Sequence, residues 1–309
     1  MSVLHGLIAR PAKLRRAVAA VLRQHAWLAP AATVICGGTL LLFALRHTIP
    51  YSTLAVAAGL FVTSYVWGYW TRASRPSRWA TTSHLQRRQY AEVWDTLAAS
   101  PTAAAFAVSG KEDEDNLRRS AEPVIRNLMD LVQIGEQDDV LEIGCGIGRI
   151  GRELAPLCRS WTGSDVSERM VTLGSERLRG IRNARFRQLQ GDGLPEFADD
   201  SFDVVYFANM LSHLDELDRW RYVKDSFRVL RPGGRIYVDT VDVESDRGWS
   251  MFTADPTPDL DSVRPPYTPR FSTGAELRNY GNRAGFDAVQ LHRQPPLVIM
   301  TAIKSKARA

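Results

Sequence analysis

The sequence predicts an α/β fold, a doubly wound and mostly parallel sheet of seven strands, preceded by an all-α transmembrane helical hairpin. Three observations predict this arrangement. Two long uncharged runs lie near the N-terminus, and short β-rich runs alternate with helical patterns from residue 139 onward. The last two apolar runs are separated only by QPP, residues 294–296. So short a link holds no crossover helix, and the final two strands are therefore expected to be antiparallel neighbours.

The charge of the chain is unevenly distributed. The 309 residues have a formal net charge of +5, yet residues 1–90 contain eleven Arg and Lys and no Asp or Glu. The rest of the chain holds 28 basic and 34 acidic side chains, a net charge of −6, so no nucleic-acid-binding face is expected there. The three cysteines have neither a paired framework nor metal-ligand spacing, and no metal site is predicted.

Residues 26–72 are expected to form a two-helix transmembrane hairpin. Between His25 and Arg46 lie 20 uncharged residues, and between His47 and Arg72 lie 24 more. A spanning helix needs about 20 predominantly apolar residues. Basic residues flank the pair on both sides, so the positive-inside rule predicts a two-pass protein of the cell membrane with both termini and the larger domain in the cytoplasm.

Residues 1–25 place apolar side chains at helical spacing between basic ones, which predicts an amphipathic helix on an anionic membrane surface. Two alternatives remain open for the N-terminal region. The hairpin could be a buried helical pair through which the chain forms a homo-oligomer, and the first 28 residues could be an organellar transit peptide. A cleavable signal peptide is disfavoured because a second apolar run follows directly. Residues 73–122 are expected to be a polar connector with helical stretches.

Residues 123–309 are expected to form one domain. Its short apolar runs predict parallel strands, and the stretches between them have helical patterns. The expected strands are residues 140–143, 160–165, 184–190, 202–209, 235–240, 288–293 and 297–304.

The stretch VLEIGCGIGRIG, residues 140–151, contains two overlapping glycine motifs. GIGRIG, from Gly146, fits the G-x-G-x-x-G turn of dinucleotide-binding proteins. EIGCGIG, from Glu142, fits E-x-G-x-G-x-G and resembles the first motif of class I S-adenosylmethionine (SAM) methyltransferases. In a dinucleotide turn the first glycine directly follows the strand, but the strand is expected to end at Ile143, and that register would begin two residues late. The resemblance to methyltransferases is therefore favoured over an NAD site.

This resemblance covers about residues 120–309, and the L-x-P-G-G sequence at residues 230–234 is a further feature of it. It implies a Rossmann-like methyltransferase fold with an antiparallel last strand, SAM as cofactor and S-adenosylhomocysteine as product. It also implies that Glu142 binds the donor's ammonium group, Asp165 accepts from the ribose hydroxyls and Asp192 accepts from the adenine amino group. The residues that it assigns to the cofactor are Glu142, Gly144, Cys145, Gly146, Gly148, Asp165, Val166, Asp192, Gly193, Leu194, Asn209 and Met210.

His213, just past the fourth expected strand, is the candidate catalytic base, because histidine has an ordinary pKa of about 6.5 and accepts a proton near neutrality. The alternative is that it only packs over the donor or caps the next helix. Asp215 and Glu216 are expected to be first-turn helix acids. Trp94 and Phe106 are expected to cover the donor.

Residues 241–273 form a Pro-rich insert that is expected on the acceptor side, since long loops in compact domains are usually functional or disordered. Its aromatic side chains either line an acceptor pocket or pin the loop to the surface, and they are Trp249, Phe252, Tyr267 and Phe271.

The sequence thus predicts a membrane-anchored SAM-dependent methyltransferase. The expected acceptor is an oxygen of a lipid-linked or membrane-partitioning small molecule, because the anchor would hold the enzyme beside such a substrate. Two other classes remain open, a non-catalytic SAM-binding interaction protein and an NAD-dependent oxidoreductase.

Overall fold

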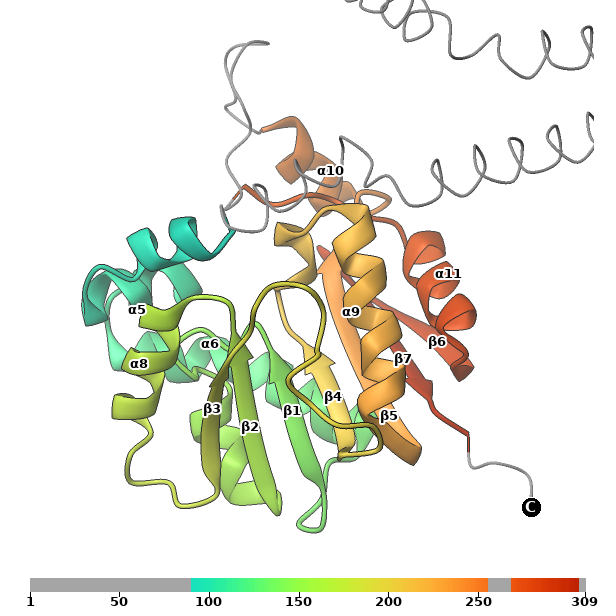
Figure 1. Cartoon of the computed structure of the whole chain (residues 1–309). Helices are drawn as coiled ribbons and strands as arrows, with labels where there is room; N and C mark the ends of the chain where they lie inside the picture. The colour runs from blue at the N-terminus through green and yellow to red at the C-terminus, as the bar shows by residue number, and fades with distance from the viewer. Residues whose placement is uncertain (1–89, 255–267, 306–309) are drawn as a thin grey trace, which may run out of the picture. The chain divides into compact units, whose positions relative to one another are not determined.

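The computed structural model describes residues 90–254 and 268–305 (Figure 1). The chain divides into two compact units, Met1–Ser77 and Arg78–Ala309, and the described residues all belong to the second. The predicted interfacial helix of residues 1–25 and hairpin of residues 26–72 lie outside them. Among the described residues, no helix is both long enough and apolar enough to cross a membrane.

Seven strands form a single sheet in the order β3-β2-β1-β4-β5-β7-β6. Neighbouring strands are parallel except at β7, which runs antiparallel to both β5 and β6. The predicted seven-stranded sheet with an antiparallel last strand is therefore confirmed. The strands are β1 (Asp139–Ile143), β2 (Ser160–Asp165), β3 (Ala184–Gln188), β4 (Phe202–Phe207), β5 (Leu230–Val241), β6 (Asp287–Gln294) and β7 (Leu297–Ile303).

Helices cover both faces of this sheet (Figure 1). Residues 90–97 are helical. The other helices are α5 (Pro101–Ser109), α6 (Glu114–Asn127), the π-helix η1 (Leu128–Val132), α7 (Gly151–Leu154), the 3₁₀ turn η2 (Ala155–Leu157), α8 (Glu168–Arg177), the 3₁₀ turn η3 (Leu211–His213), α9 (Glu216–Val229), α10 (Asp246–Thr253) and α11 (Gly274–Ala284).

Successive residues of the central strands point to opposite faces and fill two separate cores. In β4, Val205 and Phe207 belong to the core that includes Tyr222 of α9. Their neighbours Val204 and Tyr206 belong to the core formed with α6. This alternation explains why residues 204–207 of β4 form an unbroken apolar run, since both faces of the strand are buried there.

The L-x-P-G-G sequence was expected to be a turn before the fifth strand, but it lies inside β5. Phe202 of β4 pairs with Leu230, whereas Val204 pairs with Arg235, so β5 contains extra residues at this point. Gly233 has a φ of 89°, a left-handed conformation that glycine adopts readily. The segment is therefore an irregularity within the strand rather than a separate turn.

Residues 90–122 fold onto the sheet domain, and the expected boundary at residue 122 falls inside α6. Ala105 of α5 and Leu117 of α6 are buried in one cluster with Ile147 of the glycine turn and Met170 of α8. The side chain of Asp113 caps α6 by accepting a hydrogen bond of 2.7 Å from the Asn116 N–H. This part of the predicted connector therefore contributes to the walls around the glycine turn.

Trp161 of β2 fills the space behind the glycine turn. It is fully buried, and its Nε1 donates to the hydroxyl of Tyr206 at 3.1 Å. Gly151, the first residue of α7, lies against the indole, and a Cβ there would come within 2.2 Å of Trp161 Cζ2. Glycine at this position is therefore a packing requirement.

We expect Gly151→Ala to lower the free energy of unfolding by about 1–3 kcal/mol, the usual cost of overpacking a well-filled core. Denaturant titration of the purified protein measures this change. Gly180→Ala is the control, because a Cβ at Gly180 would meet no atom within 4 Å. Equal unfolding midpoints for the two variants would contradict the packing role.

Candidate active site

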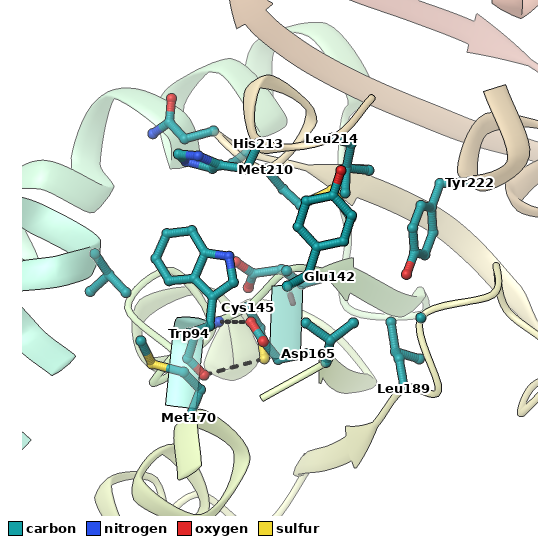
Figure 2. Close-up of a pocket in the computed structure, with 18 of the residues that line it drawn as sticks. Trp94, Glu142, Cys145, Asp165, Met170, Leu189, Met210, His213, Leu214 and Tyr222 are labelled. Atoms are coloured by element: carbon teal, nitrogen blue, oxygen red, sulfur yellow. Dashed lines mark hydrogen bonds between the residues drawn. The ribbon is translucent and has the colours of Figure 1, made fainter. Parts of the chain in front are cut away.

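A pocket lies at the carboxyl ends of β1, β2 and β4, where a parallel sheet ordinarily binds its ligand (Figure 2). It contains about 1050 Å³ of space between protein atoms, part of it open to solvent. The residues that line it are Tyr90, Trp94, Ala107, Val108, Glu142, Gly144, Cys145, Gly146, Arg149, Asp165, Val166, Met170, Leu189, Gly191, Ala208, Asn209, Met210, His213, Leu214, Asp218 and Tyr222.

The glycine turn begins directly after β1, as the E-x-G-x-G-x-G register predicts. Gly144, Gly146 and Gly148 all have positive φ, at 74°, 52° and 72°. A Cβ on Gly144 would also lie 2.4 Å from Cγ of Met210. Side chains are thus excluded both by backbone conformation and by space, and the backbone itself forms this wall of the pocket. Gly148 turns away from the pocket, since a Cβ there would lie 2.8 Å from Phe186 Cζ.

Glu142, near the end of β1, is only 2% exposed and lines the pocket. Its Oε2 accepts a hydrogen bond of 2.5 Å from the hydroxyl of Tyr206. Burial raises the pKa of Glu142 to about 8, although this hydrogen bond and the nearby Arg149 oppose the rise. A positively charged ligand group would restore the ionised form of this carboxylate.

Asp165, the last residue of β2, is held by the backbone on both sides. Its Oδ2 accepts from the Gly146 N–H at 2.9 Å and its Oδ1 from the Ser167 N–H at 3.0 Å. Burial raises the pKa of Asp165, and these backbone hydrogen bonds oppose the rise. The predicted neighbour Val166 also lines the pocket. The structure therefore brings Glu142, the glycine turn and Asp165 together, as predicted.

Three residues predicted to bind adenine do not line the pocket. The side chain of Asp192 is 59% exposed and forms an ion pair of 3.5 Å with Arg221. Leu194 is fully buried in the core, and its N–H donates to Asp225 Oδ2 at 2.8 Å. A Cβ on Gly193 would lie 2.2 Å from the same oxygen. This segment turns toward α9, so Leu189 and Gly191 reach the pocket instead.

Asn209 and Met210 follow β4 and line the pocket as predicted. Asn209 has a φ of 59°, and its N–H donates to Oδ1 of Asp239 at 2.7 Å. Asp239 is fully buried, and burial raises its pKa to about 6. Sequence reasoning missed Asp239, because it lies near the end of β5 among apolar residues and belongs to no motif.

Aromatic side chains also line the pocket. His213 and Trp94 both line the pocket, and their rings meet edge to face with centroids 5.0 Å apart (Figure 2). Tyr90 and Tyr222 were missed because they come from helices far apart in the sequence. Phe106, expected to cover the donor with Trp94, is 58% exposed and does not line the pocket.

Of the three acids that follow His213, one caps α9, one lies in its first turn and one lines the pocket. Asp215 is not in the first turn as expected but is the N-cap of α9, and its side chain accepts from the Asp218 N–H at 2.9 Å. Asp218 is only 5% exposed and lines the pocket, which the sequence did not indicate. Glu216 lies in the first turn of α9.

The described aromatics of the insert pack on one another. Trp249 contacts Phe252, and Phe252 contacts Phe271, each pair with ring centroids 5.4 Å apart. None of these three lines the pocket. Tyr267 lies outside the described residues.

Comparison with known proteins agrees with this geometry. Residues 140–234 match the family model of a methyltransferase domain. The chain is 35% identical over 101 residues to a demethylmenaquinone methyltransferase from Tropheryma whipplei (strain Twist), covering 33% of this chain and 41% of the relative. It is 30% identical over 103 residues to a ubiquinone biosynthesis O-methyltransferase from Pseudomonas fluorescens (strain Pf0-1), covering 33% of this chain and 44% of the relative. The chain thus spans less than half the length of these curated relatives.

A solved structure shares the fold. A chain of the Haloferax volcanii complex between the Trm112 methyltransferase activator and a methyltransferase matches with a TM-score of 0.50 and 17% identity, over 66% of this chain and 97% of that chain. The sheet order, the glycine turn after β1 and the family match at residues 140–234 agree with one another. Residues 140–234 are similar to a methyltransferase domain, and they lie on a seven-stranded sheet of the order described above.

Proposed function

We propose that this protein transfers a methyl group from SAM to an oxygen of a small phenolic acceptor that partitions into membranes. The observation that carries the proposal is the convergence of Glu142, the glycine turn and Asp165 on one pocket that aromatic side chains also line.

The donor side of the pocket fits two polar parts of SAM, the ammonium group and the ribose. Glu142 offers a buried carboxylate to the ammonium group, and Asp165 lies where a carboxylate accepts from ribose hydroxyls in nucleotide-binding sheets. Gly144 and Gly146 let the backbone approach closely. These groups come from two adjacent strand ends, so the sheet itself fixes their separation.

The acceptor side fits a flat, mostly apolar molecule. Trp94, Tyr90 and Tyr222 supply aromatic surface, and aromatic rings pair favourably with other rings. The two curated relatives described above carry names from quinone biosynthesis, which supports an aromatic acceptor of that kind. The uncharged runs at residues 26–45 and 48–71 support an acceptor that is available at a membrane.

SAM supplies an activated methyl group on a positively charged sulfur. In the proposed reaction a C–O bond forms to the acceptor oxygen as the C–S bond breaks, and the hydroxyl proton passes to the imidazole of His213. Trp94, edge-on to His213, restricts where that ring lies. Much of the rate would come from holding the two substrates in line within the pocket.

We expect the full-length protein to bind S-adenosylhomocysteine but not NAD, and Asp165→Ala to weaken that binding at least tenfold, because it removes the buried ribose acceptor. Calorimetric titration in detergent measures the dissociation constants. Asp199→Ala is the control, since the Asp199 side chain is 72% exposed and pairs with Arg228 at the surface. A preference for NAD would reject the donor assignment.

We expect donor binding to depend on the protonation of Glu142. Its pKa of about 8 means that the carboxyl group is neutral below pH 8 in the free protein, whereas the donor's ammonium favours the carboxylate. Affinity for S-adenosylhomocysteine should therefore rise with pH by up to about tenfold per unit and level off near pH 8. Titrations from pH 6 to 8.5 measure this dependence, and Glu142→Gln should abolish it. A flat profile in the unmodified protein would contradict the role of Glu142.

We expect His213→Asn to lower the rate of methyl transfer by roughly 10²–10⁴-fold, the usual contribution of a general base. Its affinity for S-adenosylhomocysteine should stay within threefold. The assay follows a labelled methyl group from SAM into a membrane lipid extract supplied as acceptor. Transfer that is unaffected in His213→Asn would exclude the base role, and donor binding without any transfer would favour a non-catalytic SAM-binding protein.

A further inference from the structure

Arg149 is a buried cation at the edge of the pocket. It follows the last glycine of the E-x-G-x-G-x-G motif, is only 7% exposed and lines the pocket beside Glu142. It is also the only Arg or Lys among the described residues that line this pocket.

One edge of its guanidinium is held by the protein backbone. The Nη1 group donates to the carbonyl oxygen of Ser120 in α6 at 2.5 Å, and the Ser120 hydroxyl lies 3.5 Å away. Because α6 is fixed in the core through Ala121 and Val124, this hydrogen bond sets the position of the Arg149 side chain.

No carboxylate of a described residue pairs with Arg149 within the ion-pair distance of 4.0 Å. Glu142 and Asp239 attract the guanidinium only at longer range, and burial lowers its pKa. Asp239 uses its oxygens on the Asn209 N–H and the Tyr237 hydroxyl, and Glu142 accepts from Tyr206. A charge buried without a close partner is costly, so Arg149 needs an anion that comes with the ligand.

We propose that Arg149 binds the α-carboxylate of the donor's amino-acid part, while Glu142 binds its ammonium group. The inference deepens the proposed function and rests on SAM as the donor. An amino-acid zwitterion requires one site of each charge, and this wall of the pocket holds a buried carboxylate and a buried guanidinium. The planar fork of arginine suits a carboxylate, because it can donate two parallel hydrogen bonds.

The test compares two ligands that differ only in the carboxylate, S-adenosylhomocysteine and its decarboxylated analogue S-adenosyl-3-thiopropylamine. Calorimetry on the full-length protein measures both dissociation constants. In the unmodified protein we expect the analogue to bind at least tenfold more weakly. In Arg149→Met we expect S-adenosylhomocysteine to lose at least tenfold in affinity while the analogue changes less than threefold, so that the preference disappears.

Two variants make the result decisive. Arg152→Met is the matched control, because Arg152 lies one turn further along, pairs with Glu114 at the surface and should change neither affinity. Arg149→Lys keeps a cation but not the fork and should retain only part of the preference. It serves as the test if Arg149→Met fails to fold, since the ratio of the two affinities is measured within one protein.

Equal losses for both ligands in the Arg149 variants would overturn the inference, because they would show that Arg149 acts only by stabilising Glu142 or the fold. An unmodified protein that binds both ligands equally would overturn it as well. If the unmodified protein bound neither ligand but bound NAD, the failure would belong to the proposed function.

Discussion

The site depends on how the end of β1 is fastened to the end of β2. The Gly144 and Cys145 N–H groups both donate to the Ser164 carbonyl, at 2.7 and 3.0 Å, and the Ser164 hydroxyl returns a hydrogen bond of 2.9 Å to the Glu142 carbonyl. These contacts turn the chain sharply at the strand end, where Gly144 and Gly146 have positive φ. Asp165 comes next in β2 and therefore lies beside the turn, so one local junction places both acids that we propose bind the donor.

Behind this junction lies a chain of buried polar groups. Trp161 donates to Tyr206, and Tyr206 donates to Glu142, so that the position of the carboxylate is fixed from the core outward. Arg149 and Asp239 extend the same region toward α6 and β5. Glu142, Tyr206 and Asp239 all have hydrogen-bond partners within the protein, which is the usual condition for burying polar groups without loss of stability. Arg149 has a hydrogen bond to Ser120, but no carboxylate of a described residue forms an ion pair with it, and this is the charge that we propose the ligand balances.

The helical segment 90–97 contributes Tyr90 and Trp94 to the pocket lining and is held at two points. Asp95 accepts from the Ser167 hydroxyl at 2.6 Å and from the Arg169 N–H at 3.1 Å, at the start of α8. The Tyr90 hydroxyl accepts from the Asp215 N–H at 3.2 Å, at the start of α9. Trp94 lies between these two attachments. The segment is thus attached to the starts of both α8 and α9, and these two attachments hold Trp94 at the pocket.

The sequence by itself determined the sheet and the donor-binding turn. Alternating apolar runs, the QPP link and the glycine motif after VLEI are local features, and they predict strands, their direction and the positions of Glu142 and Asp165 because each depends on residues close in the chain. The positions of the other residues in and around the pocket came only from the tertiary structure. Asp192 turned toward Arg221, Asp239 was buried within an apolar strand, and Trp94, Arg149 and Tyr222 met in one pocket. Contacts between distant segments decide such placements, and neither periodicity nor spacing records them.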